Sequence, residues 1–98
     1  MLGLTRALAA ELVGYNITAN AICPGYVDTP LTDQAVANIA ARTGRSQAEA
    51  RAALERTSPQ NRLMTSGEVA AVAVLLASDS ARGINGQAIN VDGGAVTF

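Results

Sequence analysis

The sequence predicts an α/β fold, as part of a doubly wound parallel sheet, from two observations in its 98 residues. Helical and strand patterns alternate, and a strand, a helical crossover and a second strand form the unit of a parallel sheet. The first strand pattern, residues 17–23, is apolar or small on both faces, which is typical of a strand with helices on both sides. Two strands alone bury too little surface, so we expect them to belong to a larger sheet.

The first predicted helix covers residues 2–13, which consist largely of the helix-favouring residues Leu, Ala, Arg and Glu. One of its stripes is formed by Leu4, Leu8 and Leu12. Apolar residues also occupy the other faces, so we expect this helix to be buried on two sides. Gly14 is the predicted stop, because glycine commonly follows the last helical turn.

The first predicted strand ends at Pro24–Gly25 and contains one polar exception, Asn20. A buried amide without hydrogen-bond partners costs about 1 to 3 kcal/mol, so we expect Asn20 to tie the strand to a neighbouring loop. Cys23 is the single cysteine, which excludes an intrachain disulfide. We interpret Cys23 as a small, buried hydrophobic residue rather than a reactive thiol.

Residues 24–30 are bracketed by two prolines and predict a loop, in which Gly25 is expected to give backbone freedom. Helical patterns over residues 31–41 and from Ser46 onward predict a helical hairpin. Ser46 and Glu49 have the spacing of a capping box, as do Thr65 and Glu68.

The last part of the chain predicts a strongly apolar helix over residues 69–77 and a second strand over residues 88–91. Gly83 and Gly86 mark the turn between them. The sequence Asp92-Gly93-Gly94 is expected to stop the strand.

The composition excludes several function classes. Apolar residues make up 49% of the chain and charged residues 15%, which argues against a disordered chain. The net charge of −1 argues against nucleic acids and anionic membrane surfaces as partners. The chain has no His and no Lys, so imidazole metal sites, His-dependent triads and lysine Schiff bases are excluded from it. No secretory signal and no apolar run of about 18 residues is visible, which predicts a soluble, cytoplasmic protein.

Three segments in order resemble the short-chain dehydrogenase/reductase family, and together they cover nearly the whole chain. They are residues 3–12 (GLTRALAAEL), residues 17–30 (ITANAICPGYVDTP), and the run with EVA at 68–70, LLASD at 75–79 and GQAINVDGG at 86–94. The first resembles the family just beyond its Tyr-x-x-x-Lys motif. The resemblance implies the C-terminal part, residues 1–98, of a single NAD(P)-binding Rossmann-like domain and an oxidoreductase acting on a ketone or secondary alcohol.

The family's catalytic Ser, Tyr and Lys have no counterparts here, since neither Tyr15 nor Tyr26 has a Lys four positions later, and no Gly-rich phosphate loop is present. Catalytic residues are therefore predicted to be absent, and the chain alone is expected to be inactive. The resemblance instead implies cofactor binding by Pro24, Gly25, Val27 and Thr29 beneath the nicotinamide of NAD or NADP. In this interpretation the Val27 backbone and the Thr29 hydroxyl bind the carboxamide.

A plainer interpretation makes the loop a proline-bracketed turn in which Thr29 caps the next helix. Asp28 is interpreted as a solvated or helix-N-terminal carboxylate. By resemblance, residues 31–57 form a substrate lid. Its arginines are expected to form a solvated face, with an acidic or phosphorylated substrate as the alternative partner of one of them; they are Arg42, Arg45, Arg51 and Arg56.

The lid and the stretch from residue 58 to 65 are similar to those of bacterial 3-hydroxybutyrate dehydrogenases and 3-oxoacyl reductases, which would make a small ketone, alcohol or 3-oxoacyl compound the substrate. Residues 91–94 would form a turn near a subunit interface, with a homo-tetramer for the complete protein. Alternatives stay open: a non-enzymatic oligomerisation fragment, one half of a split enzyme, or, favoured over both, a truncation or misassigned start, because Met1 falls inside a predicted helix.

Overall fold

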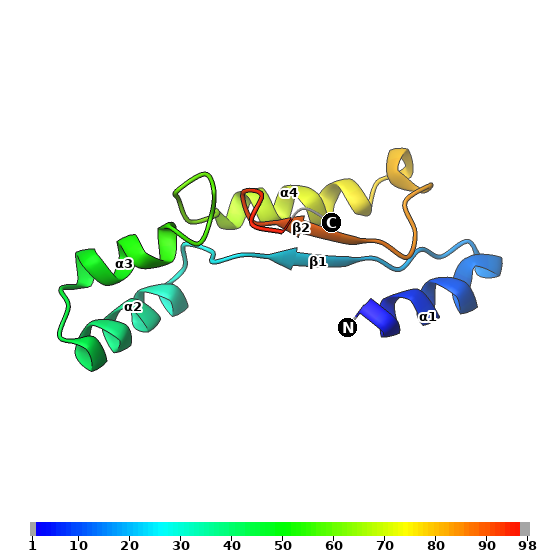
Figure 1. Ribbon diagram of the computed structural model, residues 1–98. Helices are drawn as coiled ribbons and strands as arrows, with labels where there is room; N and C mark the ends of the chain where they lie inside the picture. Colours follow the sequence, from blue (N-terminus) through cyan, green and yellow to red (C-terminus); the bar gives the residue numbers. More distant parts are fainter. Residues whose placement is uncertain (1, 97–98) are drawn as a thin grey trace.

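The computed structural model describes residues 2–96. The helices and strands are, in chain order, α1 (Leu2–Leu12), β1 (Ala21–Pro24), α2 (Pro30–Thr43), α3 (Gln47–Glu55), α4 (Ser66–Leu76) and β2 (Ala88–Val91), with short 3-10 helices at Val13–Tyr15 and Asp79–Ala81. The molecule is elongated, 55 by 24 by 23 Å. The α2–α3 hairpin lies beyond the carboxyl end of β1, while α1 lies at the opposite end of the strands (Figure 1).

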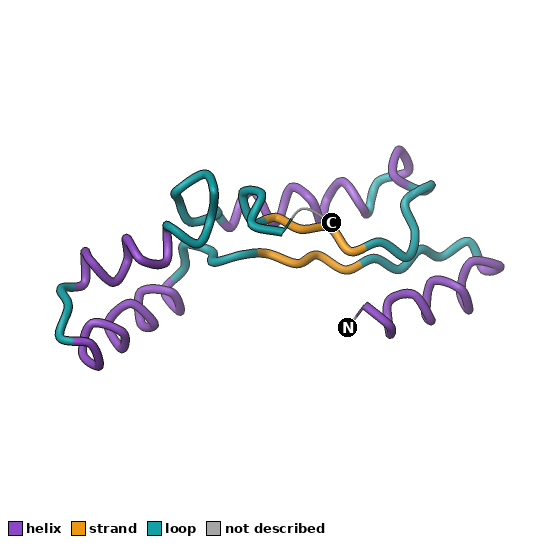
Figure 2. The backbone as a smooth tube through the Cα atoms, in the orientation of Figure 1, coloured by secondary structure: helices purple, strands orange, loops and turns teal. Residues whose placement is uncertain are grey.

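The two strands pair in parallel, with Ala21 opposite Ala88 and Pro24 opposite Val91. The predicted strand–crossover–strand unit is therefore confirmed. The helix α4 runs along one side of the strands, between α1 at one end and the α2–α3 hairpin at the other (Figure 2). The first strand begins at Ala21 rather than at residue 17, because the Ala19 N–H donates to the Asn85 side chain (3.0 Å) instead of a backbone carbonyl.

Asn20 makes the cross-connection that the sequence predicts. Its Nδ2 donates to the carbonyl of Ile84 (3.0 Å), and its Oδ1 accepts from the Gln87 N–H (3.1 Å). The amide is half-buried and both of its ends are satisfied. Asn20 thus fixes the segment before β1 against the loop that leads into β2.

The hydrophobic core lies in the α2–α3 hairpin and the segment that follows it. It consists of Val36, Ala40, Ala50, Leu54 and Leu63, with Ile39 at its margin. The helix α4 contributes no buried residue, and α1 contributes only Thr5 and Ala9. The expected burial of α1 on two sides is therefore not found within this chain, where Leu4 is 64% exposed.

The helix ends follow local sequence signals with one correction. Both predicted capping boxes are formed, Ser46 with Glu49 and Thr65 with Glu68. Asn16, rather than Gly14, takes the left-handed conformation (φ 60°) after the first helical segment, because the chain continues as a 3-10 helix through Tyr15. Within residues 2–96, no helix is long and apolar enough to cross a bilayer.

Candidate functional site

The loop between β1 and α2 starts where both strands end. The Gly25 N–H donates to the carbonyl of Val91 (3.0 Å), so the loop leaves the sheet beside the end of β2. A Cβ at Gly25 would lie 3.1 Å from the Cβ of Asp92. This close approach, rather than backbone freedom, favours glycine here, since its φ is not positive.

Residue 64 holds the loop from the other side. The Met64 N–H donates to the carbonyl of Tyr26 (2.9 Å), and its carbonyl accepts from the Asp28 N–H (2.8 Å). These two bonds pair Val27 with Met64 as an isolated parallel bridge. In such a bridge the intervening residue turns its own N–H and carbonyl away from the partner strand.

Val27 consequently presents its backbone N–H on the side of the loop away from Met64. Its carbonyl accepts a hydrogen bond from the Thr32 hydroxyl. Its N–H makes no hydrogen bond within residues 2–96. Val27 as a residue is half-buried, and its unpaired N–H is a donor to which a ligand acceptor can bind.

Thr29 caps α2, as the plainer interpretation of this loop predicts. Its Oγ1 accepts from the Thr32 N–H and lies 3.4 Å from the Thr32 Oγ1. Because the Thr32 hydroxyl proton is directed to Val27, Thr29 is the donor in its contact with the Thr32 hydroxyl, and the Thr29 oxygen keeps a second acceptor site for a ligand N–H. Capping and ligand binding by Thr29 are therefore compatible.

Asp28 makes an ion pair that the sequence did not predict. Its Oδ2 lies 3.0 Å from the Arg51 guanidinium on α3, and the same guanidinium lies 3.6 Å from Asp33. The hydrogen bond with Asp28 raises the pKa of Arg51. Asp28 is exposed and lies just before the N-cap of α2, as predicted, but it is paired with Arg51, which is the partly exposed member of the predicted arginine face. The other three lid arginines are exposed and make no ion pair among the described residues.

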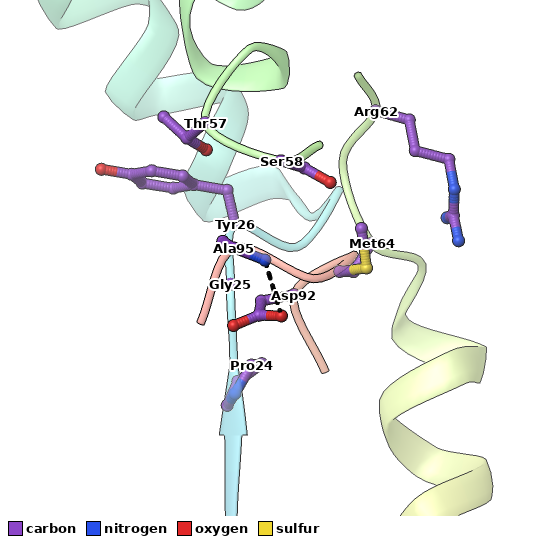
Figure 3. A pocket seen from close by; sticks show the side chains of 9 residues that line it. All are labelled: Pro24, Gly25, Tyr26, Thr57, Ser58, Arg62, Met64, Asp92 and Ala95. Atoms are coloured by element: carbon purple, nitrogen blue, oxygen red, sulfur yellow. Dashed lines mark hydrogen bonds between the residues drawn. The ribbon is translucent and has the colours of Figure 1, made fainter. Parts of the chain in front are cut away.

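A cavity of about 310 Å³ opens beside the loop. It is lined by the strand ends and by the segment after α3, namely Pro24, Gly25, Tyr26, Thr57, Ser58, Arg62, Met64, Asp92 and Ala95. Figure 3 shows Tyr26 and Thr57 on one side and Met64 and Arg62 on the other.

Asp92 forms the turn after β2, as the sequence predicts. Its carboxylate accepts from the backbone N–H groups of Gly94, Ala95 and Val96, at 3.0 to 3.2 Å. Gly93 has a φ of 70°, and a Cβ there would collide with the Ser58 hydroxyl. The turn therefore forms one wall of the cavity, and position 93 in it has no room for a side chain.

The Arg62 guanidinium anchors the segment after the hairpin to α4. It binds Glu68 through two parallel hydrogen bonds, of 2.9 and 2.5 Å. These bonds, with the Thr65 N–H as the next contributor, lower the pKa of Glu68 to about 2. The bidentate geometry fixes the start of α4 relative to Met64 and so to the loop.

The site combines a mainly apolar cavity wall with backbone and hydroxyl hydrogen-bonding groups of the loop. Residues 2–96 contain no group of three His, Cys, Asp or Glu side chains that could hold a metal ion. Cys23 is half-buried, less enclosed than we expected. The structure brings the four predicted cofactor residues, Pro24, Gly25, Val27 and Thr29, into one loop, and their role toward a cofactor stays a prediction.

Comparison with known proteins gives consistent matches over the whole chain. The profile of a family described as Enoyl-(Acyl carrier protein) reductase matches residues 1–96. The D-beta-hydroxybutyrate dehydrogenase of Cupriavidus necator is 40% identical, over 98% of this chain and 38% of the relative. This chain therefore spans less than half the length of the curated relatives that it matches.

Solved structures agree with the sequence matches. A short chain dehydrogenase family protein from Francisella tularensis superposes with a TM-score of 0.92 at 35% identity, over 96% of this chain and 39% of that structure. An actinorhodin polyketide ketoreductase with NADPH superposes with a TM-score of 0.89 at 33% identity, over 99% of this chain and 37% of that structure. The predicted class, part of a Rossmann-like α/β domain, is confirmed.

Proposed function

The chain belongs to the short-chain dehydrogenase/reductase family, and from this membership we propose that the complete protein is an NAD(P)-dependent oxidoreductase. It transfers hydride between a nicotinamide and a ketone or secondary alcohol. The relatives named as ketoreductase and D-beta-hydroxybutyrate dehydrogenase support this reaction class. Because the chain spans 38% of the latter relative, this activity is proposed for the whole protein, not for these residues alone.

The contribution of these residues is to form the floor of the nicotinamide pocket. A bound nicotinamide would supply the hydride, and its carboxamide group offers one acceptor and two donors. The free Val27 N–H and the Thr29 hydroxyl can both bind such a group. Pro24 and the side-chain-free Gly25 provide a flat apolar surface at the adjoining strand end.

One observation carries the proposal: the unpaired Val27 N–H lies in a loop whose backbone is already fixed. Hydrogen bonds to Met64 and Val91 hold the residues on either side of it. A donor fixed before ligand binding loses little conformational entropy when the ligand arrives. The loop also follows the carboxyl end of a parallel strand, the edge where doubly wound folds bind ligands.

The α2–α3 hairpin serves as the lid over the substrate, which corresponds to residues 31–57 of the sequence prediction. It projects beyond the carboxyl end of β1, next to the loop (Figure 1). We assign a small ketone, a secondary alcohol or a 3-oxoacyl compound as substrate, following the named relatives. The complete protein is proposed to be a homo-tetramer, in which the exposed apolar side chains of α1 and α4 are covered.

The test is the affinity of the complete protein for NADH and NADPH, measured by fluorescence titration. Replacement of Thr29 by Val should weaken binding about fivefold, the value of one hydrogen bond, whereas Thr29→Ser should retain affinity. Thr18→Val is the matched control, because Thr18 is exposed and precedes β1, whereas the loop follows β1. Failure of the complete protein to bind either nucleotide would refute the proposal. The 98-residue chain alone should show no NAD(P)H-dependent reductase activity.

A further inference from the structure

One arginine of the hairpin reaches back to the nicotinamide loop. Arg51 lies on α3, and its guanidinium is 3.0 Å from Asp28 in the loop and 3.6 Å from Asp33 on α2. It is the one arginine of the hairpin that makes an ion pair among the described residues. The guanidinium is therefore shared between a carboxylate of the lid itself and a carboxylate of the loop.

The backbone of Arg51 is anchored in the hairpin. Its sequence neighbour Ala50 is completely buried, and Leu54, one turn later, is 7% exposed, both within the hydrophobic core. Packed side chains of this kind move with their helices rather than independently. The position of the Arg51 backbone therefore follows the position of the whole hairpin.

The backbone of Asp28 is anchored on the opposite side. Its N–H donates to the carbonyl of Met64, and its neighbours in the sequence are Val27 and Thr29, the two proposed carboxamide ligands. The Asp28 carboxylate therefore joins the hairpin to the residue that separates these two ligands.

We propose that Arg51 is a positioning residue whose ion pair with Asp28 couples lid position to cofactor binding, an inference that rests on the proposed function. With the lid over the loop, Arg51 binds Asp28 and so holds Val27 and Thr29 in the positions that suit the carboxamide. When the lid moves away, Asp33 remains as the partner of Arg51 on the same hairpin. Cofactor binding and lid closure then favour each other, as linkage between two sites requires.

The experiment compares Arg51→Met, Asp28→Asn and the double variant in the complete protein. Met keeps the apolar stem of Arg51 but removes the charge. Arg42→Met is the matched control, since Arg42 lies on the other lid helix and makes no ion pair among residues 2–96. The two measurements are the NADH or NADPH dissociation constant and the amide hydrogen exchange of the peptides covering residues 24–29 and 46–57.

Each single variant should weaken cofactor binding about two- to fivefold, as expected for an exposed ion pair, and speed exchange in both peptides. The double variant should match the single variants, because the two changes remove one interaction. High salt should remove the difference between the parent and Arg51→Met. Arg42→Met should resemble the parent.

Additive effects in the double variant, or an Arg51→Met protein indistinguishable from Arg42→Met, would overturn the coupling. Faster exchange in the hairpin with unchanged cofactor affinity would also overturn it, because the lid would then move without affecting the ligands. If the parent protein bound no nicotinamide nucleotide, the proposed function would fail and the coupling to the cofactor with it. Exchange of residues 24–29 would then separately show whether Arg51 restrains the loop.

Discussion

The α2–α3 hairpin and the region around the two strands differ in where their apolar side chains lie. The hairpin is the less apolar of the two, yet it contains most of the hydrophobic core, including the fully buried Ala50. The most apolar helix, α4, has no buried residue, and its Val74 is 72% exposed. The hairpin therefore has its own core. In the strand region, by contrast, α1 and α4 expose apolar side chains to which other segments or subunits can bind.

The largest expected effect lies in the core of the hairpin. Leu54→Ala should lower the free energy of opening of α2 and α3 by about 2 to 4 kcal/mol, because it leaves a cavity among closely packed neighbours. Amide hydrogen exchange of the two helices measures this quantity directly. Leu31→Ala is the control, since Leu31 is 76% exposed at the start of α2. Equal effects of the two variants would show that the hairpin has no core of its own.

The strand region gives the next largest effect if its exposed faces are covered in the complete protein. Leu75 is 51% exposed on α4 in this chain. Leu75→Ser should lower the free energy of unfolding of the complete protein by about 2 kcal/mol, because a buried leucine loses its transfer energy. Denaturant unfolding measures the change. A loss no larger than that of Leu31→Ser would mean that this face stays in water.

The hydrogen bonds of Asn20 should contribute to holding the strand region together, where only small apolar residues such as Ala21 and Ala81 are buried. Asn20→Ala should cost about 1 to 2 kcal/mol, because the Ile84 carbonyl and the Gln87 N–H lose their partner. The loss should be visible as faster exchange around β1 and β2, with the hairpin unchanged. Asn38→Ala, at an exposed position on α2, provides the comparison. Faster exchange in the hairpin as well would contradict the independence of the two regions.

The smallest effect concerns the ion pair at the boundary of the two regions. The pKa of Glu68 is lowered from 4.5 to about 2, so its ionised form stabilises the folded state above about pH 4.5. That contribution is lost as the pH falls from about 4.5 to about 2. Glu68→Gln should therefore flatten the dependence of the unfolding free energy on pH in this window. An unchanged pH profile would contradict a role for the Arg62–Glu68 pair, and Glu11→Gln serves as the control.

The sequence predicted those features whose signals are local. The capping boxes at Ser46 and Thr65 each depend on two residues three positions apart, so the pattern contains the whole interaction. The partners of Asn20 lie more than sixty residues away, yet the need for partners followed from one amide in an apolar strand. A polar group in an apolar context is informative because its burial is costly.

The missed features depend on distant segments that only the fold brings together. Asp28 and Arg51 are separated by α2, and neither residue type nor spacing indicated that they meet. The role of Gly25 depends on how closely Asp92 approaches it. The free N–H of Val27 depends on the register with Met64. The residues of the candidate site were thus predicted from the resemblance. The contacts that shape the site, such as the approach of Asp92 to Gly25, are visible only in the structure.

The self-contained core of the hairpin has an evolutionary consequence. Side chains of β1 and β2 take no part in that core, so amino-acid changes inside the hairpin need not be compensated in the sheet. Amino-acid changes in the hairpin can then accumulate without matching changes in the two strands. Such changes are constrained mainly where Leu63, Met64 and Arg51 join the hairpin to the rest of the structure.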